Sequence, residues 1–156
     1  VLQNETQADA LPLEALHQAA FGPGRYARAA FRLREGKAPR YDLSKLAFLD
    51  GRLVGAVRLT DIEIGSEKAV LLGPLCTQPD MKGKGIGRTL MHAAVDASRQ
   101  VGLPAILLVG DFAYYNPFGF ERVPQGSIVM PGSVDPTRLL IAKLDDGNGS
   151  LTGQVR

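Results

Sequence analysis

Residues 71–90 read LLGPLCTQPDMKGKGIGRTL and predict a buried strand, a glycine-rich basic turn and the start of a long helix. Glycine lacks a Cβ, so the backbone of such a turn can approach a ligand closely. The first N–H groups of a helix have no intrahelical acceptor and lie at its positive end, where anions bind. The residues concerned are Lys82, Gly83, Lys84, Gly85, Ile86, Gly87 and Arg88. The pattern favours a phosphate-bearing cofactor over the alternative, a tight strand-to-helix connection with solvated basic residues.

Two better-known phosphate loops do not match this turn. A Walker A loop requires Gly, four residues and then Gly-Lys-Ser/Thr, a pattern that the chain lacks. The dinucleotide-binding fingerprint Gly-x-Gly-x-x-Gly requires a different spacing from the strictly alternating glycines of residues 83–87. What remains is Lys82-x-x-Gly85-x-Gly87 at the beginning of a helix.

Length and composition predict one soluble domain. The chain has 156 residues, of which 45% are hydrophobic and 22% charged, values that are ordinary for a globular protein with a real core. We expect a single domain over residues 1–145. Glycine, Asn, Ser and Thr dominate after Asp145, so residues 146–156 are expected to form a flexible tail.

Charge and cysteine content exclude several classes of partner. A formal net charge of +2 is too small to indicate nucleic acid as the main partner. No apolar run approaches the roughly 18–20 residues of a membrane span. The single cysteine, Cys76, rules out an intramolecular disulfide and fits a reducing compartment, so a cytoplasmic location is expected. His17, expected to be partly exposed, and His92, expected to face solvent, form no metal-ligand spacing with Cys76, so no metal is expected.

Hydrophobic periodicity predicts an α/β (α+β) fold with a central mixed β-sheet flanked by helices. Helices are expected over residues 9–21, 25–35 and 87–101, and strands over residues 1–6, 46–49, 53 onward, 69–77, 105–109, 127–130 and 139–144. Asp50-Gly51 is a strong hairpin signal. The strand–helix–strand succession of residues 69–109 predicts a crossover unit with parallel strands.

Pro74 lies within the strand that precedes the turn. Proline cannot donate to a strand ladder, so it predicts a bulge or a point where this strand parts from its neighbour. The carboxyl ends of the two parallel strands meet at one edge of the sheet, where α/β folds bind ligands. Backbone groups left unpaired there can pair with an extended, amide-bearing ligand. Phosphate at the turn and an amide-bearing arm along the strand describe coenzyme A.

Two motifs resemble those of the GNAT N-acetyltransferases. The turn is similar to the family's Gln/Arg-x-x-Gly-x-Gly/Ala acetyl-CoA motif, with Lys82 in the place of Gln or Arg. The segment YYNPFGF over residues 114–120 resembles the family's aromatic-Tyr-x-x-x-Gly-Phe segment. The resemblance covers most of the chain and is strongest to a bacterial branch of acetyltransferases known from sequence. It implies the GNAT-like acyl-CoA N-acyltransferase fold and transfer of an acetyl group from acetyl-CoA to a primary amine.

The resemblance also implies roles for individual residues. The backbone of Leu75, Cys76 and Thr77 would pair with the pantetheine arm, and the N–H groups of residues 83–88 would surround the pyrophosphate. Tyr115 falls on the position of the general acid, and Asn116 lies near the cofactor arm. A phenol suits this role because its ordinary pKa near 10 keeps it protonated at neutral pH. If the segment over residues 114–120 is extended, Tyr114 faces away from Tyr115 and packs with Phe118.

Several points stay open at the level of sequence. The general base is Asp61, Glu63, Asp111 or a water molecule, because the strand position where many relatives carry Glu is apolar here. Direct transfer is expected, with the thiol of Cys76 a small buried hydrophobe. The alternatives are a non-catalytic acyl-CoA-binding module and an interaction subunit. The acceptor is a small-molecule or peptide amine or a protein lysine; other acyl groups and a homodimer are also open.

Overall fold

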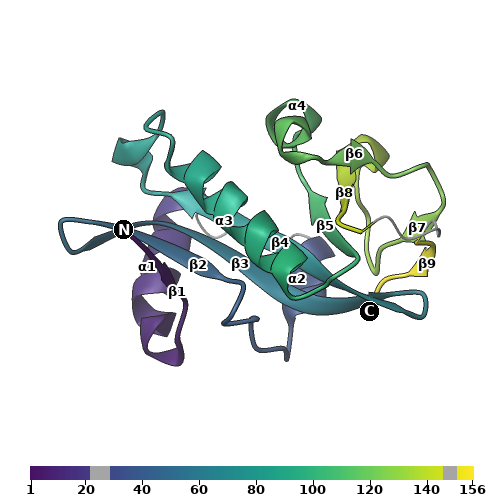
Figure 1. Cartoon of the computed structure of the whole chain (residues 1–156), viewed down its shortest axis with the longest axis horizontal. Helices are drawn as coiled ribbons and strands as arrows, with labels where there is room; N and C mark the ends of the chain where they lie inside the picture. The colour runs from purple at the N-terminus through teal and green to yellow at the C-terminus, as the bar shows by residue number, and fades with distance from the viewer. Residues whose placement is uncertain (22–28, 146–150) are drawn as a thin grey trace.

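The computed structural model describes residues 1–21, 29–145 and 151–156 and builds them around a seven-stranded sheet of order β1-β2-β3-β4-β5-β8-β6 (Figure 1). The strands are β1 Leu2–Asn4, β2 Lys45–Leu49, β3 Arg52–Ile64, β4 Glu67–Thr77, β5 Ala105–Val109, β6 Glu121–Arg122, β7 Ile128–Val129, β8 Leu139–Lys143 and β9 Gly153–Gln154. The helices are α1 Ala10–Phe21, α2 Ala29–Arg34, α3 Ile86–Gln100 and α4 Phe112–Tyr115, with short 3₁₀ turns at Gln7–Asp9, Pro79–Met81, Asn116–Phe118 and Pro136–Arg138. The predicted α/β class with a mixed sheet flanked by helices is confirmed. Part of the helix expected over residues 25–35 lies outside the described residues.

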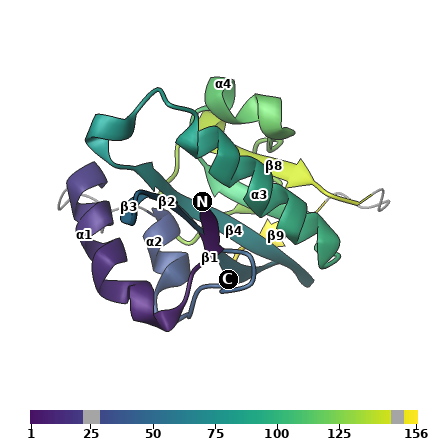
Figure 2. The ribbon, with the colours of Figure 1, turned by 60° about the vertical axis from the view of Figure 1, so that its left-hand side comes forward.

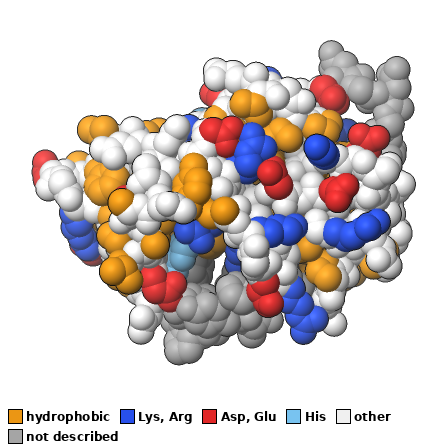
Figure 3. Space-filling model, turned by 90° about the horizontal axis from the view of Figure 1, so that it is seen from below, with side chains coloured by type: hydrophobic (Ala, Val, Ile, Leu, Met, Phe, Trp, Pro, Cys, Tyr) orange, Lys and Arg blue, Asp and Glu red, His pale blue; other side chains and the backbone are white. Residues whose placement is uncertain are grey.

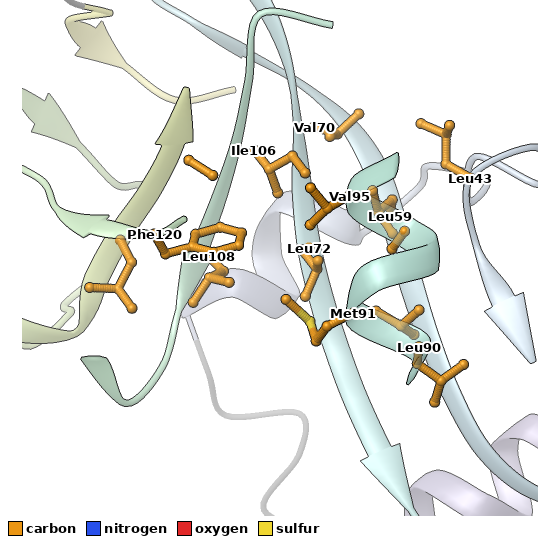
Figure 4. Close-up of a cluster of buried hydrophobic side chains, with 14 of the residues drawn as sticks. Leu43, Leu59, Val70, Leu72, Leu90, Met91, Val95, Ile106, Leu108 and Phe120 are labelled. Carbon is orange, nitrogen blue, oxygen red and sulfur yellow. The ribbon is translucent and has the colours of Figure 1, made fainter. Parts of the chain in front are cut away.

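Helices cover both faces of the sheet. Helices α1 and α2 lie on one face, and α3 lies on the other with α4 beyond its first turn (Figure 2). Each face has its own apolar core. The core under α3 joins β2–β5 and β8 to Phe120 (Figure 4). The core under α1 contains Leu13, Leu16 and Cys76, and Leu33 of α2 belongs to a third cluster.

The β2–β3 hairpin forms at Asp50-Gly51, as predicted, with both residues at positive φ (52° and 78°). The pairing with β2 then shifts register between Ala47 and Phe48, with one extra residue in β3. Because this bulge shifts the alternation of β3 by one residue, Leu53 packs with the α1 core while Val57 and Leu59 lie under α3. Sequence alternation alone predicts that these three residues share a face, and for Leu53 this prediction is wrong.

Strands β4 and β5 are parallel and joined by α3, as the crossover pattern predicts. They pair only at Val70–Ile106 and Leu71–Leu107. On its other side, β4 stays paired with β3 as far as Thr77, apart from the register shift opposite residues 73–74. The predicted parting of β4 from β5 near Pro74 is confirmed. We call the β5-facing side of residues 72–77 the open edge.

Helix α3 packs closely on the sheet. Its buried residues are Leu90, Met91, Ala94, Val95 and Ser98. Val101, the last residue of the helix expected over residues 87–101, is 51% exposed because the helix ends at Gln100. The first turn of α3 is seated over Gly55 of β3. A Cβ on Gly55 would lie 2.7 Å from Ile86 Cγ2 and 3.0 Å from Leu90 Cδ1. The absence of a side chain at Gly55 thus brings the beginning of α3 down to the end of β4.

The last six residues are not a flexible tail, which corrects the expectation for residues 151–156. Strand β9 pairs in parallel with β7, and Val155 is only 4% exposed (Figure 1). Backbone hydrogen bonds join Glu63 and Arg156 in both directions, at 2.9 and 3.0 Å. These hydrogen bonds give partners to backbone groups of the last six residues. The polar side chains of this segment do not reveal such pairing. Residues 146–150 lie outside the described residues. In the part of the chain that is described, no helix is both long and apolar enough to cross a membrane.

Candidate functional site

The open edge of β4 leads directly into the glycine-rich turn. The turn is anchored at its start by Met81, which is 7% exposed and packs in the core under α3. Arg52 and Asp80 form a double ion pair at 2.9 and 3.1 Å that ties the turn to β3. The turn therefore holds a fixed position at the end of the open edge.

The glycines of the turn leave space in front of the helix. Gly83 and Gly85 have positive φ values (80° and 79°), and a Cβ on either would meet nothing within 4 Å. Gly85 is the N-cap of α3, and Thr89 N and Oγ1 donate to its carbonyl oxygen at 3.1 and 3.0 Å. The side chains of Lys82, Lys84 and Arg88 are exposed around the turn. Free helix N–H groups, open space and three cations form a donor set that fits a pyrophosphate.

The two adjacent tyrosines lie on a helical turn, which corrects the expectation of an extended segment. Asp111 caps α4 by accepting a hydrogen bond from Ala113 N at 3.2 Å. The rings of Tyr114 and Tyr115 meet edge to face with centroids 4.8 Å apart. The two side chains therefore lie next to each other and not on opposite faces of the segment.

Tyr114 and Tyr115 have different surroundings. Tyr114 is 43% exposed and packs against Phe118 with ring centroids 5.8 Å apart, as expected. Its hydroxyl lies 2.6 Å from the position that a Cβ would take on Gly87. Burial raises the pKa of Tyr114, and Arg88 opposes that rise. Tyr115 is half-buried between the core under α3 and Gly110, which follows β5. Both phenols are thus near the two strand ends that border the open edge.

Cys76 contributes its backbone and its thiol to different regions. Its backbone belongs to the open edge, whereas its side chain is 5% exposed and packs against α1. Burial raises the pKa of the Cys76 thiol to about 12. A thiol with that pKa is protonated at neutral pH, so it is a poor nucleophile. The sequence-based reading of Cys76 as a buried hydrophobe agrees with this environment.

The remaining predicted site residues are partly engaged elsewhere. Asn116 Nδ2 donates to the carbonyl oxygen of Phe120 at 3.0 Å, which fixes the loop after α4. Asp61 pairs with Arg40 at 2.9 Å. Glu63 lies opposite Lys68, near the β3–β4 turn and four residues beyond the Leu59–Leu72 pair. Asp111 caps α4. Among the three candidate bases, Glu63 is the one most removed from the open edge.

The structure also brings together residues that the sequence analysis missed. Arg58 lies on β3 opposite the bulge at residues 73–74 of β4, and it donates from Nε to Glu5 Oε1 at 3.1 Å. Glu5 is 3% exposed; burial raises its pKa and Arg58 opposes that rise. The buried hydroxyl of Ser44 supports the bulge by accepting from Leu59 N at 2.9 Å. Glu5 and Arg58 are 53 residues apart in sequence, so no local pattern signals the pair.

The two histidines lie on helices that cover opposite faces. His92 is exposed on α3, as expected, and its ring meets Phe118 at 5.1 Å. His17 is 7% exposed on α1, so the expectation of a partly exposed side chain was wrong. The described residues contain no group of three or more His, Cys, Asp or Glu side chains that could hold a metal ion.

Comparisons with known proteins identify the family. The model of the acetyltransferase (GNAT) family matches residues 11–120, well over half of the chain. The Escherichia coli K12 N-acetyltransferase YjhQ is 29% identical over 74% of this chain and 66% of its own length, and YhbS is 28% identical over 99% and 94%. The crystal structure of YhbS with CoA matches at a TM-score of 0.81 over 99% of this chain and 87% of that one. A Brucella melitensis GNAT acetyltransferase solved with acetyl-CoA matches at 0.75, with 25% identity over 99% and 93%. The chain therefore belongs to the GNAT family of acetyltransferases.

Proposed function

We propose that this chain transfers the acetyl group of acetyl-CoA directly to a primary amine. The observation that carries the proposal is the open edge of β4 ending at an anion-accepting turn. The pyrophosphate binds at residues 83–88, and Lys82 adds charge beside it. The amides of the pantetheine arm pair with the backbone of Leu75, Cys76 and Thr77 as an added strand would. YhbS and the Brucella protein, solved with CoA and acetyl-CoA, support this use of the same fold.

Tyr115 is proposed as the general acid. The amine nitrogen attacks the thioester carbonyl carbon, a C–N bond forms and the C–S bond breaks. The departing thiolate takes the Tyr115 phenol proton, and the proton lost by the amine passes to water, which returns one to the phenol. Asn116 supports this role by fixing the loop that carries Tyr115. The protein otherwise contributes orientation, which is a large part of catalysis between two bound reactants.

Direct transfer is supported by the state of Cys76. A covalent acyl-cysteine would require a thiolate, but this thiol is buried against α1 and its pKa is raised to about 12. The amine must therefore attack the thioester itself. Both substrates must therefore be bound at the same time.

The test is acetyl-CoA turnover with a library of primary amines, measured as the release of free thiol. We expect thiol release with at least one amine, and an N-acetylated product of matching mass. Cys76→Ala should retain turnover, because no step uses the thiol. Cofactor binding without turnover on any amine would favour the non-catalytic acyl-CoA-binding module. Failure to bind CoA at all would favour the interaction subunit.

The cellular location and the class of partner are also proposed. The single cysteine and the lack of a spanning helix in the described residues support a cytoplasmic location. The net charge of +2 argues against nucleic acid as a partner.

A further inference from the structure

A cavity of about 310 Å³ lies in the segment between β6 and β8, on the face of the sheet that α2 covers. Its floor consists of Val123, Ile128 and Leu139, which are buried in the apolar cluster that also contains Leu33 of α2. The half-buried side chains of Met130 and Val134 pack against the same cluster and form its walls. Its size falls within the range of small-molecule sites, about 300–1,000 Å³.

The lining of the cavity is uncharged throughout. Its two polar side chains, Gln125 and Ser133, are both exposed. The face shown in Figure 3 is more mixed, with Lys, Arg, Asp and Glu side chains between the hydrophobic ones. A charged or hydroxyl-rich group would give up its water in the cavity without finding charged partners there. The lining therefore favours an apolar group.

Hydrogen bonds hold the walls of the cavity in place. Strand β9 supports β7, because Gly153 N donates to Ser127 O and Val155 N donates to Val129 O, both at 2.9 Å. From the side of α2, Arg32 Nη1 donates to the carbonyl oxygen of Pro131 at 3.4 Å. The cavity is thus formed before any ligand enters it.

The floor of the cavity lies in line with the segment Gly73-Pro74 of β4. Leu71 pairs with Leu107, and two residues further along both strands Gly73 lies opposite Val109, across the open edge. Val109 in turn pairs with Leu139, which belongs to the floor. Because neighbouring strands lie about 4.8 Å apart, the floor is about 10 Å or more from Gly73.

The cavity and Gly73 also share a face of the sheet. Arg34 Nη1, at the end of α2, lies 3.9 Å from the position that a Cβ would take on Gly73, so this position faces α2. If the proposed function is correct, an arm that runs along β4 from the turn reaches Gly73-Pro74 last, and the thioester lies near this segment. Tyr115 packs with the core under α3, which leaves the α2 side for the acceptor.

We propose that the acceptor is a primary amine that carries an aromatic ring, and that the ring occupies this cavity; this inference rests on the proposed function. An apolar cavity of about 150 Å³ is enough for benzene. The cavity beside β8, at about 310 Å³, therefore has room for one ring and part of its linker. An extended chain covers at most about 3.6 Å for every three bonds, so roughly eight bonds separate the amine from the ring.

The experiment measures acceptor binding apart from turnover. The full chain is saturated with CoA, which has no acetyl group to transfer, and NMR titrations follow the binding of 2-phenylethylamine, 4-phenylbutylamine and 6-phenylhexylamine. Each is compared with the amino alcohol that has the same linker. We expect a longer phenyl amine to bind about 10-fold or more tightly than its amino alcohol, the effect of burying a ring. The shortest pair should differ less, because its ring does not reach the cavity.

The same titrations locate the ring. Its ring current should shift the methyl signals of Ile128, Val134 and Leu139, which line the cavity. The methyl signals of Leu13 and Leu16, in the core under α1, should not move.

Variants that fill the cavity test the assignment. Val134→Trp should reduce the preference for the ring about 10-fold, and Met130→Trp fills the cavity from another wall. Val101→Trp makes the same exchange at a 51% exposed position beyond the end of α3 and should leave the preference unchanged. Circular dichroism shows whether each variant is folded.

Three results would overturn the inference: equal binding of phenyl amine and amino alcohol at every linker length, cavity methyl signals that do not move, or equal effects of Val134→Trp and Val101→Trp. Acetylation of the amino alcohols in preference to every phenyl amine would overturn it as well. A separate CoA titration tests the donor site. Loss of CoA binding would reject the proposed function, whereas normal CoA binding without a preference for the ring would reject only this inference.

Discussion

At the scale of single residues, Tyr115 is the side chain on which the proposed chemistry depends most. Removal of one general acid typically costs about 10²–10⁴ in rate. Tyr115→Phe should therefore lower turnover by that order with little change in acetyl-CoA affinity, since the ring still packs against the core under α3. The measurement is steady-state turnover with calorimetric titration of the cofactor.

Tyr114→Phe is the matched control, because it removes a hydroxyl from the neighbouring position of the same helical turn. The Tyr114 ring is 43% exposed, so the change should affect stability little. A folded but inactive Tyr114→Phe beside a fully active Tyr115→Phe would reverse the assignment. This outcome is physically possible because the Tyr114 hydroxyl lies beside Gly87, at the beginning of α3.

Sequence patterns revealed the residues of the site that lie close together along the chain. Turn glycines and adjacent aromatic residues have a fixed local spacing, so their grouping is visible in the sequence. The Glu5–Arg58 pair and the position of Arg34 over Gly73 depend on tertiary packing. The predicted orientation, with Tyr114 facing away from Tyr115, was wrong because it assumed an extended segment, whereas the Asp111 cap starts a helix there.

At the scale of elements, the turn before α3 should be the most sensitive part of the cofactor site. Gly85→Val places a β-branched side chain at φ 79°, where such residues are strained, and fills the space in front of the helix. We expect acetyl-CoA binding to be lost while the fold is retained, as measured by calorimetry and circular dichroism.

Gly102→Val provides the control at the other end of α3. Gly102 has φ 81° and nothing within 4 Å of its Cβ position, so the backbone penalty is similar. The two variants should lose comparable thermal stability, and only Gly85→Val should lose the cofactor. Undiminished cofactor affinity in Gly85→Val would remove the turn from the proposed site.

Long or strongly signalled elements were predictable, and so were the short strands β1 and β7, but β6 and β9 were not. Asp50-Gly51, the crossover over residues 69–109 and the effect of Pro74 all follow from local rules. Strands β6 and β9 have two residues each, too few to show any alternation. They form because neighbouring backbone groups need partners, which is a property of the folded molecule.

At the scale of the whole molecule, the chain end stabilises the β3–β4 hairpin. Val155→Ala should reduce the free energy of unfolding by about 1–3 kcal/mol, because Val155 is 4% exposed and its truncation leaves a cavity. Val129→Ala, at a 47% exposed position of β7 whose carbonyl accepts from Val155 N, should change it by less than about 0.5 kcal/mol. Chemical denaturation of both variants makes the comparison. Equal values would mean that residues 151–156 contribute little.

The open edge of β4 also bears on solubility. A strand edge with unpaired backbone groups is a template on which another copy of the chain can add a strand and begin to aggregate. A pantetheine arm on that edge would block such growth, so bound acetyl-CoA should protect the enzyme from aggregation. Acetyl-CoA at about 100 times its Kd would add about 2.7 kcal/mol to the stability of the folded state. Light scattering during heating should accordingly begin at a higher temperature with CoA than without it, and an unchanged onset would show that the edge is harmless. Wherever acetyl-CoA runs low, the protein would then lose its protection against aggregation together with its substrate.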